Sequence, residues 1–309
     1  PCNRTVNVGM MYVMDADGGN IRQLTFEQDH NYCPSVTSDG RILYLRWEYT
    51  DIPHVWARML FTMNPDGTGQ RELYGSGSYW PNSIFYARAV PGHATKIVGT
   101  VTGHHVGRIG ETVVFDPAAG QGIAGVVQRV PGYAQPVVPA IEDKLTLASW
   151  PKTVHPLPLS ENYFLVSAKP RPDDLWGIYL MDVFDNMLLL MEVDGQALVE
   201  PIPLRATRRP PVLVERVDPT RQDALVYLQD VYAGPGLRGV PRGSVRKLRL
   251  FTYHFAYQGI AGINHRVGAD GPWEPKRVLG TVNVETDGSA LFRAPANTPI
   301  SVQPLDEHG

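Results

Sequence analysis

Residues 29–33, Asp-His-Asn-Tyr-Cys, contain the first side chains whose types and spacing could bind a metal ion. His30 and Cys33 are three residues apart, so an imidazole and a thiolate can reach one ion, with Asp29 beside them. Zinc is the metal that such a set favours. The alternative is that Cys33 is a packing residue, because free cysteine is commonly buried. In either case we expect a reduced thiol that is not bonded to Cys2, the only other cysteine.

The adjacent histidines His104 and His105 are the second candidate. Neighbouring residues of a strand point to opposite faces, so both rings can contact one metal only from a loop. The Val-Gly-Arg-Ile-Gly stretch at 106–110 predicts such a loop. We therefore expect a metal or substrate contact there, unless one histidine is buried with a hydrogen bond and the other is solvated.

Polar aromatic residues form the third candidate group. Trp47 ends an apolar stretch, and Tyr79 and Trp80 follow a later one. Such side chains can line a pocket or pack between neighbouring sheets. No G-x-S-x-G nucleophile turn and no H-E-x-x-H zinc motif occurs in the sequence, which argues against a serine peptidase and a metalloprotease of those types.

The elements that carry these residues are repeated. YVMDADGGNIRQLT at 12–25 reappears as FTMNPDGTGQRELY at 61–74, each an apolar strand, an Asp-Gly turn and a second strand. We align Tyr-Cys-Pro at 32–34 with Tyr-Trp-Pro at 79–81 and Ser-Trp-Pro at 149–151, each followed by another apolar strand. The repeats predict about three four-stranded blades of a β-propeller.

The first repeat resembles the TolB-like propeller repeat, which implies a propeller fold. A propeller closes with 4–8 blades, so about three form an open arc that missing sequence or another chain must complete. We expect these blades to occupy residues 1–205.

The composition changes at 201–219, where prolines and arginines disfavour both strand and helix and predict a linker. Apolar strands at 224–232 and 245–257 follow, then three more within 277–309, with no long amphipathic helix among them. A small antiparallel β-sandwich at 206–309 is the simplest packing, so the predicted fold class is all-β.

Charge and hydropathy exclude several partners. The net charge of −3 over 309 residues argues against nucleic-acid binding. No run of 18 apolar residues exists to span a membrane.

Because the chain begins with Pro1 rather than Met, we expect a natural or cloned fragment of a longer protein.

Two long stretches of the second half, 230–259 and 287–309, resemble the middle domain of the hydrazine synthase alpha subunit-like family. The stretches RILYLRWEYTDIPH and YWPNSIFYAR of the first half are similar to the propeller of that family. The resemblance implies an exported bacterial protein, periplasmic or otherwise extracytoplasmic. It also implies c-type haem bound by C-x-x-C-H segments after the middle domain. This chain has no C-x-x-C-H, so it cannot attach haem c covalently by itself.

The resemblance leads to two hypotheses. In the first, the chain is the propeller and middle-domain portion of a haem-associated oxidoreductase-like protein, whose partner is a haem domain or another protein. Cys33, His30, Tyr79 and Trp80 then face the cofactor, while His104, His105 and Asp29 bind a metal such as zinc. In the second, the propeller is a non-catalytic scaffold for a protein or cell-envelope partner.

Overall fold

The structure is a computed structural model that describes residues 9–27, 30–47, 58–75, 78, 80–133, 135–234, 236–254 and 275–309. These residues form two compact units. The first unit takes the described residues between 31 and 216, and the second takes the others. The predicted boundary at residue 205 stays a prediction.

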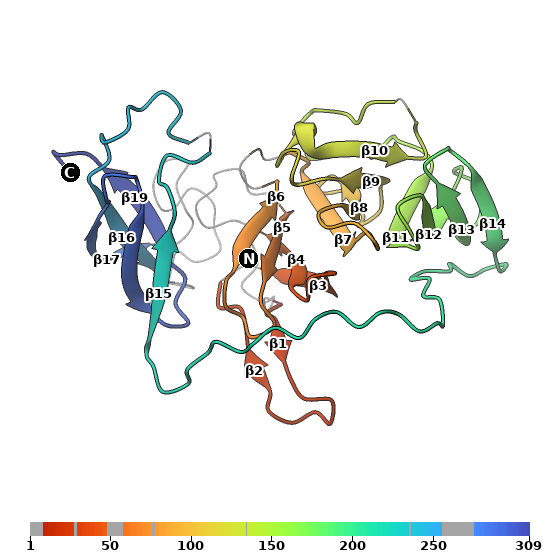
Figure 1. The fold of residues 1–309 in the computed structure, drawn as a ribbon. Coiled ribbons are helices and arrows are strands. Elements are labelled where there is room, and N and C mark those ends of the chain that lie inside the picture. Colours follow the sequence, from red (N-terminus) through yellow and green to blue (C-terminus); the bar gives the residue numbers. More distant parts are fainter. Residues whose placement is uncertain are drawn as a thin grey trace. The chain divides into compact units, whose positions relative to one another are not determined.

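The first unit contains three groups of four antiparallel strands, which we call blades 1 to 3 (Figure 1). Blades 1 and 2 are joined into one larger sheet by a single parallel bridge between Arg58 and Ser83. Blade 1 comprises β3 (Asn31–Val36), β4 (Ile42–Trp47), β5 (Arg58–Met63) and β6 (Arg71–Tyr74). Blade 2 comprises β7 (Ser83–Ala89), β8 (Ile97–Thr102), β9 (Glu111–Phe115) and β10 (Val126–Val130), with a 3₁₀ turn at Ile123–Gly125. Blade 3 comprises β11 (Lys152–Pro158), β12 (Tyr163–Lys169), β13 (Gly177–Asp182) and β14 (Met187–Met191).

Apolar side chains fill the space between successive blades. One core joins blade 1 to blade 2 through residues such as Leu43, Leu45 and Ile84. A second core joins blade 2 to blade 3 through residues such as Val98 and Phe164. The blades therefore pack face to face, each sheet burying apolar residues against the next.

The Asp-Gly turns have the conformation that the sequence predicts. Gly67 has a φ of 86°, and Gly18 in the N-terminal hairpin has a φ of 87°. The Oδ1 atom of Asp66 accepts a hydrogen bond from the backbone N–H of Thr68 at 2.9 Å. Turn geometry thus accounts for the repeated aspartate and glycine.

The chain after β14 has neither helix nor strand until residue 223, as predicted for a linker (Figure 1). Within the first unit, this segment lies against two turns of blade 1. The backbone N–H of Arg216 donates to Asp66 at 2.7 Å. Gly40, with a φ of 83°, lies so close to the carbonyl of Pro211 that a side chain there would clash.

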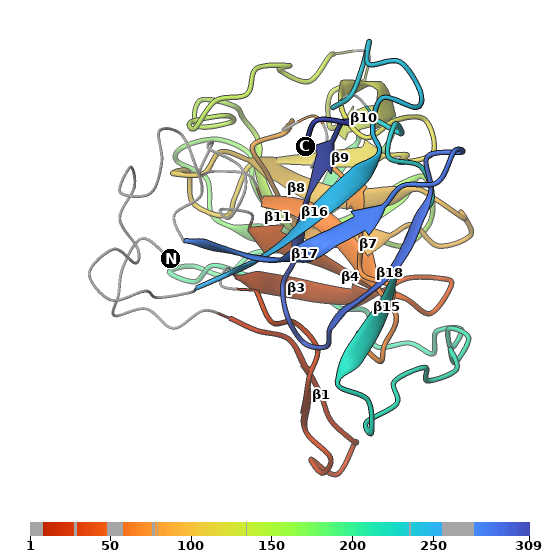
Figure 2. The same ribbon diagram turned by 90° about the vertical axis from the view of Figure 1, so that its left-hand side faces the viewer.

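The second unit contains two antiparallel sheets that share an apolar core. Figure 2 shows their strands, with β15 beside β18 and β16 beside β17. Leu248 and Leu250 of the three-stranded sheet pack with Phe292 of the two-stranded sheet. The sheets comprise β15 (Asp223–Leu228) with β18 (Ala290–Pro295), and β17 (Lys276–Asn283), β16 (Lys247–Tyr253) and β19 (Ser301–Leu305). A short hairpin of β1 (Tyr12–Val13) and β2 (Arg22–Gln23) belongs to the same unit.

The predicted fold class is confirmed. The described chain is all-β, with several sheets of which none closes into a barrel, consistent with a partial propeller followed by a sandwich. No helix in the described ranges has the length and apolarity needed to cross a bilayer.

Candidate functional site

The first strand of each blade is interrupted at the same point by one extra residue. In β3 the register shifts between Tyr32 and Ser35. In β7 it shifts between Phe85 and Arg88, and in β11 between Val154 and Leu157. The residues lifted out of register are Cys33, Tyr86 and His155, and we call them the bulge triad.

The bulge triad shares an unusual backbone conformation. Cys33, Tyr86 and His155 have φ values of 53°, 53° and 54°, in the left-handed region that side chains disfavour. Each such residue costs about 1–3 kcal/mol and persists only where the surrounding structure enforces it. A β-bulge re-aims a side chain relative to its strand, so three strands here redirect three chemically active groups in the same way.

The triad side chains lie next to one another. The rings of Tyr86 and His155 have centroids 4.0 Å apart at an interplanar angle of 56°. Cys33 and Tyr86 both pack against the core between blades 1 and 2, and the Tyr86 backbone hydrogen-bonds the Cys33 thiol. All three are half-buried, so a ligand can still reach them.

Burial keeps the triad uncharged at neutral pH. It raises the pKa of the Cys33 thiol and of the Tyr86 phenol. Burial also lowers the pKa of His155, although the Glu200 carboxylate 3.3 Å away acts in the opposite direction. The site therefore presents a thiol, a phenol and a neutral imidazole. These groups can donate hydrogen bonds, but the thiol is not an activated nucleophile.

Arginine side chains surround the triad. The Arg108 guanidinium lies 5.2 Å from the Tyr32 ring centroid and 5.5 Å from that of Phe85. It also hydrogen-bonds the Tyr86 side chain and acts to lower the pKa of that phenol.

The positive charge of Arg88 acts to lower the pKa of both Cys33 and His155, so Arg88 lies near them as well. The arginine side of the triad suits a ligand with a negatively charged edge, whereas Glu200 places a carboxylate 3.3 Å from the His155 ring.

The histidine pair lies in a loop, as predicted, between β8 and β9. The two imidazoles are 4.4 Å apart, edge to face. The His105 ring bonds Asp143 at 2.7 Å, and the His104 ring packs 5.1 Å from that of Trp47. In the part of the chain that the structure describes, no three residues of the types His, Cys, Asp and Glu are grouped to hold a metal.

The other predicted site residues do not lie together in the structure. Trp80 is only 2% exposed, and its indole N–H donates to the carbonyl of Val138 at 2.9 Å, so it packs in the core. His30 belongs to the second unit, where its Nδ1 accepts a hydrogen bond from the Gly9 N–H. Asp29 and Tyr79 lie outside the described residues.

The repeat alignment drawn from the sequence needs correction. Trp80 precedes β7 and Trp150 precedes β11, whereas Cys33 lies inside β3 at its bulge. The structural equivalents of Cys33 are Tyr86 and His155, not the two tryptophans. Sequence reasoning missed both residues because a bulge leaves no fixed letter pattern. The recurring position before a proline or alanine is the one signal that could have found them.

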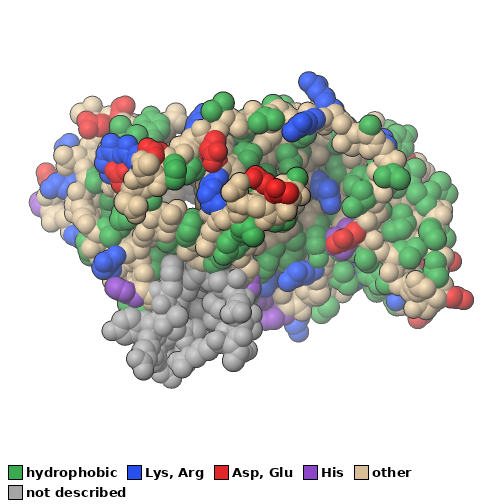
Figure 3. Space-filling view, turned by 90° about the horizontal axis from the view of Figure 1, so that it is seen from below, with side chains coloured by type: hydrophobic (Ala, Val, Ile, Leu, Met, Phe, Trp, Pro, Cys, Tyr) green, Lys and Arg blue, Asp and Glu red, His purple; other side chains and the backbone are tan. Residues whose placement is uncertain are grey.

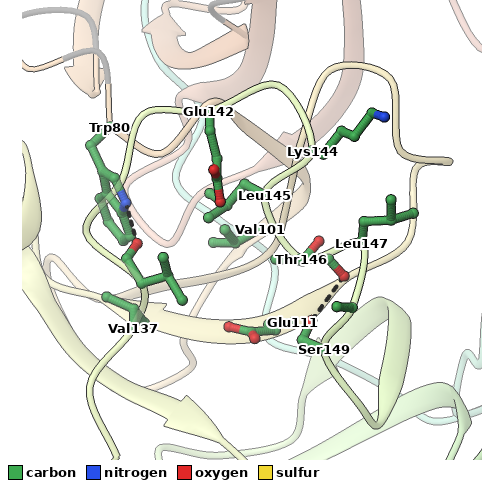
Figure 4. A pocket seen from close by; sticks show the side chains of 12 residues that line it. Trp80, Val101, Glu111, Val137, Glu142, Lys144, Leu145, Thr146, Leu147 and Ser149 are labelled. Atoms are coloured by element: carbon green, nitrogen blue, oxygen red, sulfur yellow. Dashed lines mark hydrogen bonds between the residues drawn. The ribbon is translucent and has the colours of Figure 1, made fainter.

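A small cavity of about 170 Å³ lies near Trp80 (Figure 4). Its polar groups include Glu111, whose carboxylate pairs with Arg129 at 3.3 Å. Most of its wall is the loop 137–149, and none of the bulge triad lines it. The cavity is therefore separate from the bulge triad.

Comparison with known proteins gives two matches. Residues 243–309 match the family described as the hydrazine synthase alpha subunit middle domain. The fold is similar to the solved structure of Kuenenia stuttgartiensis hydrazine synthase, with a TM-score of 0.68 and 16% sequence identity. That match covers 94% of this chain and 42% of the other, so the chain spans less than half the length of its structural relative. No curated protein sequence matches the chain.

Proposed function

We propose that this chain forms part of a haem-associated oxidoreductase-like protein. Its resemblance to the hydrazine synthase alpha subunit-like family is confirmed by both matches. The observation that carries the proposal is the middle-domain match at 243–309 joined to a similar fold over nearly the whole chain. At 16% identity the reaction of the relative is not transferred. The proposed location is the periplasm or another extracytoplasmic compartment.

The chain's own residues do not fit a covalently bound haem. Thioether attachment needs two cysteines in C-x-x-C-H, and the sequence has only Cys2 and Cys33, far apart. In the proposal, haem c is therefore carried by a partner domain or protein. The described residues do not fit a zinc centre of their own either.

The bulge triad is the proposed cofactor-facing surface. Its neutral thiol, phenol and imidazole can donate hydrogen bonds without adding charge, while Arg88 and Arg108 supply positive charge beside them. Arginine pairs well with carboxylates in such partly buried surroundings. This surface would position and electrostatically stabilise an anionic edge of the cofactor, while the redox chemistry belongs to the cofactor itself.

The test is the haem content and turnover of the full-length natural protein. We expect covalent haem that maps outside residues 1–309. His155→Gln and Tyr86→Phe should shift the haem absorption spectrum or slow turnover while leaving haem content unchanged. Tyr163→Phe is the control, because Tyr163 is 44% exposed on blade 3. A natural protein without covalent haem contradicts the proposal.

A non-catalytic scaffold is the second candidate function. It is favoured by the neutral state of the triad and by the lack, among the described residues, of a metal-binding group. In this case a protein or cell-envelope partner binds the triad face. His155→Gln and Arg108→Ala would then weaken partner binding, and no redox turnover would be found.

A further inference from the structure

The loop at 137–149 is fastened near both of its ends, although it contains neither helix nor strand. Near the first end, the carbonyl of Val138 accepts a hydrogen bond from the Trp80 indole. Near the second, the buried amine of Lys152 donates to the carbonyl of Thr146. Thr146 has a φ of 68°, which a β-branched side chain strongly disfavours and which is typical of ligand-binding and catalytic sites. The fastened loop makes the cavity beneath it preformed, as ligand sites usually are.

That cavity has a mostly apolar wall and one buried carboxylate. Its volume is about 170 Å³, and Val101, Val137 and Leu145 are among the apolar residues that line it. A cavity of about 150 Å³ with such a wall holds a benzene-sized molecule. Glu111 lines the same cavity, although its side chain is only 8% exposed. In the view of Figure 4, Leu145 and Val101 lie between the carboxyl groups of Glu111 and Glu142.

One oxygen of the Glu111 carboxylate is left for a ligand. The Oε1 atom accepts a hydrogen bond from Arg129 at 3.3 Å. Within the described ranges, the Oε2 atom of Glu111 has no hydrogen-bond partner. A carboxylate oxygen that is removed from bulk water needs a donor, so the cavity favours a ligand that supplies one.

The charge of Glu111 is already balanced inside the protein. Arg129 pairs with it, and Lys152 is near enough for the carboxylate to affect its titration. Burial lowers the pKa of the Lys152 amine, and the Glu111 carboxylate acts in the opposite direction. An ammonium ligand would therefore meet two cations beside the carboxylate, and an anionic ligand would meet the carboxylate itself. A neutral hydrogen-bond donor meets neither penalty.

We propose that this cavity binds one small neutral molecule that has a benzene-sized apolar body and a hydroxyl group donating to Oε2 of Glu111. A single hydroxyl matches this single acceptor, whereas an amide would bring further polar groups that the apolar wall leaves unpaired. Val138 and Leu147 also line the cavity and are 48% and 52% exposed, so the cavity opens to solvent. The site does not depend on haem or on the bulge triad.

Calorimetric titration of the full-length natural protein tests the ligand class. Phenol should bind saturably, with one molecule per chain at this site. Toluene has the same shape without the donor and should bind about tenfold more weakly, because the hydrogen bond to a charged acceptor is lost. Benzylamine and benzoate, which are charged at neutral pH, should also bind about tenfold more weakly or not at all. Equal affinity for toluene, tighter binding of benzylamine, or no saturable phenol binding overturns the proposal.

Glu111→Gln should reverse the preference of the site. The variant has nearly the same shape, and its side-chain oxygen can still accept from Arg129, so an amide N–H replaces the acceptor Oε2. Phenol should then bind about tenfold more weakly, while benzaldehyde, which only accepts hydrogen bonds, should bind more tightly than it does to the wild type. The matched control is Glu142→Gln, the same change at an exposed position on the loop, which should leave both affinities unchanged. An unchanged preference in Glu111→Gln overturns the proposal.

Exposed apolar side chains are the competing place for such probes. Figure 3 shows hydrophobic side chains gathered at the right of the view, where blade 3 lies in Figure 1, and Leu188 and Leu190 of β14 are 59% and 51% exposed. Val137→Phe should fill the cavity and abolish phenol binding without altering that surface, whereas Leu188→Ser should leave phenol binding unchanged. If Val137→Phe binds phenol as tightly as the wild type does, the probe lies on the exposed surface and the proposal is overturned.

Discussion

The rings of Tyr86 and His155 lie 4.0 Å apart, although 69 residues separate them in sequence. They meet because each stands at the bulge of the first strand of its blade, with the same left-handed backbone. A propeller-like repeat thus brings distant residues together by placing equivalent positions side by side.

His155 should make stability depend on pH. Burial lowers the pKa of the folded-state imidazole, so the unfolded chain binds a proton more readily. The contribution to stability is fully present above the ordinary histidine pKa and is lost as the pH falls below it. The urea midpoint of the wild type should therefore drop between pH 7 and pH 5, about the window in which histidine titrates. His155→Gln should flatten this dependence.

The matched control for that measurement is His308→Gln. The His308 side chain is 84% exposed, so its replacement should leave the pH dependence of the midpoint as in the wild type. An unchanged slope in His155→Gln would contradict the burial argument.

Cys33 should react slowly with alkylating reagents. It is a free thiol in the structure, as predicted, and burial raises its pKa. Because the thiolate is the reactive form, iodoacetamide at neutral pH should modify Cys33 about tenfold more slowly in the folded chain than in urea. Peptide mass spectrometry distinguishes Cys33 from Cys2. Rapid modification of Cys33 in the folded chain at neutral pH would show an activated thiolate instead.

Trp80 and Trp150 should differ in their effect on stability despite the same Trp-Pro sequence. Trp80 is 2% exposed and packs in the core between blades 1 and 2. Trp80→Ala should lower the free energy of unfolding by about 3–5 kcal/mol, because it leaves a cavity and an unpaired carbonyl at Val138. Trp150 is 41% exposed, so Trp150→Ala should cost much less. Urea unfolding of both variants measures the difference, and equal losses would contradict this placement of Trp80.

The sequence predicted the strands and turns better than it predicted the residues of the bulge triad. The apolar strand expected after Tyr-Cys-Pro at 32–34 is β4 (Ile42–Trp47), and the two Asp-Gly turns of the repeat have the expected backbone. Such features depend on local propensity and alternation. The site depends on bulges, which change the register between two strands and so become visible only when both strands are placed. For that reason Cys33 was identified from its chemistry, while its neighbours Tyr86 and His155 were not.

The last prediction concerns the histidine loop. Burial acts to raise the pKa of Asp143, but hydrogen bonds from the His105 side chain and backbone outweigh it and hold that pKa below the ordinary value. A carboxylate with a depressed folded pKa stabilises the fold above its unfolded pKa, and this stability is lost as the pH falls through the folded pKa. His105→Ala removes the ring contact at 2.7 Å, so the pKa of Asp143 should rise.

Carboxyl-selective NMR titration measures that change directly. Asp218 is the internal control, because a hydrogen bond from the Thr220 side chain lowers its pKa and His105 is not among its partners. In His105→Ala the Asp143 titration should therefore move to higher pH while that of Asp218 stays in place. If neither midpoint moves, the backbone N–H of residue 105, which donates to Asp143 at 3.0 Å, holds the carboxylate by itself.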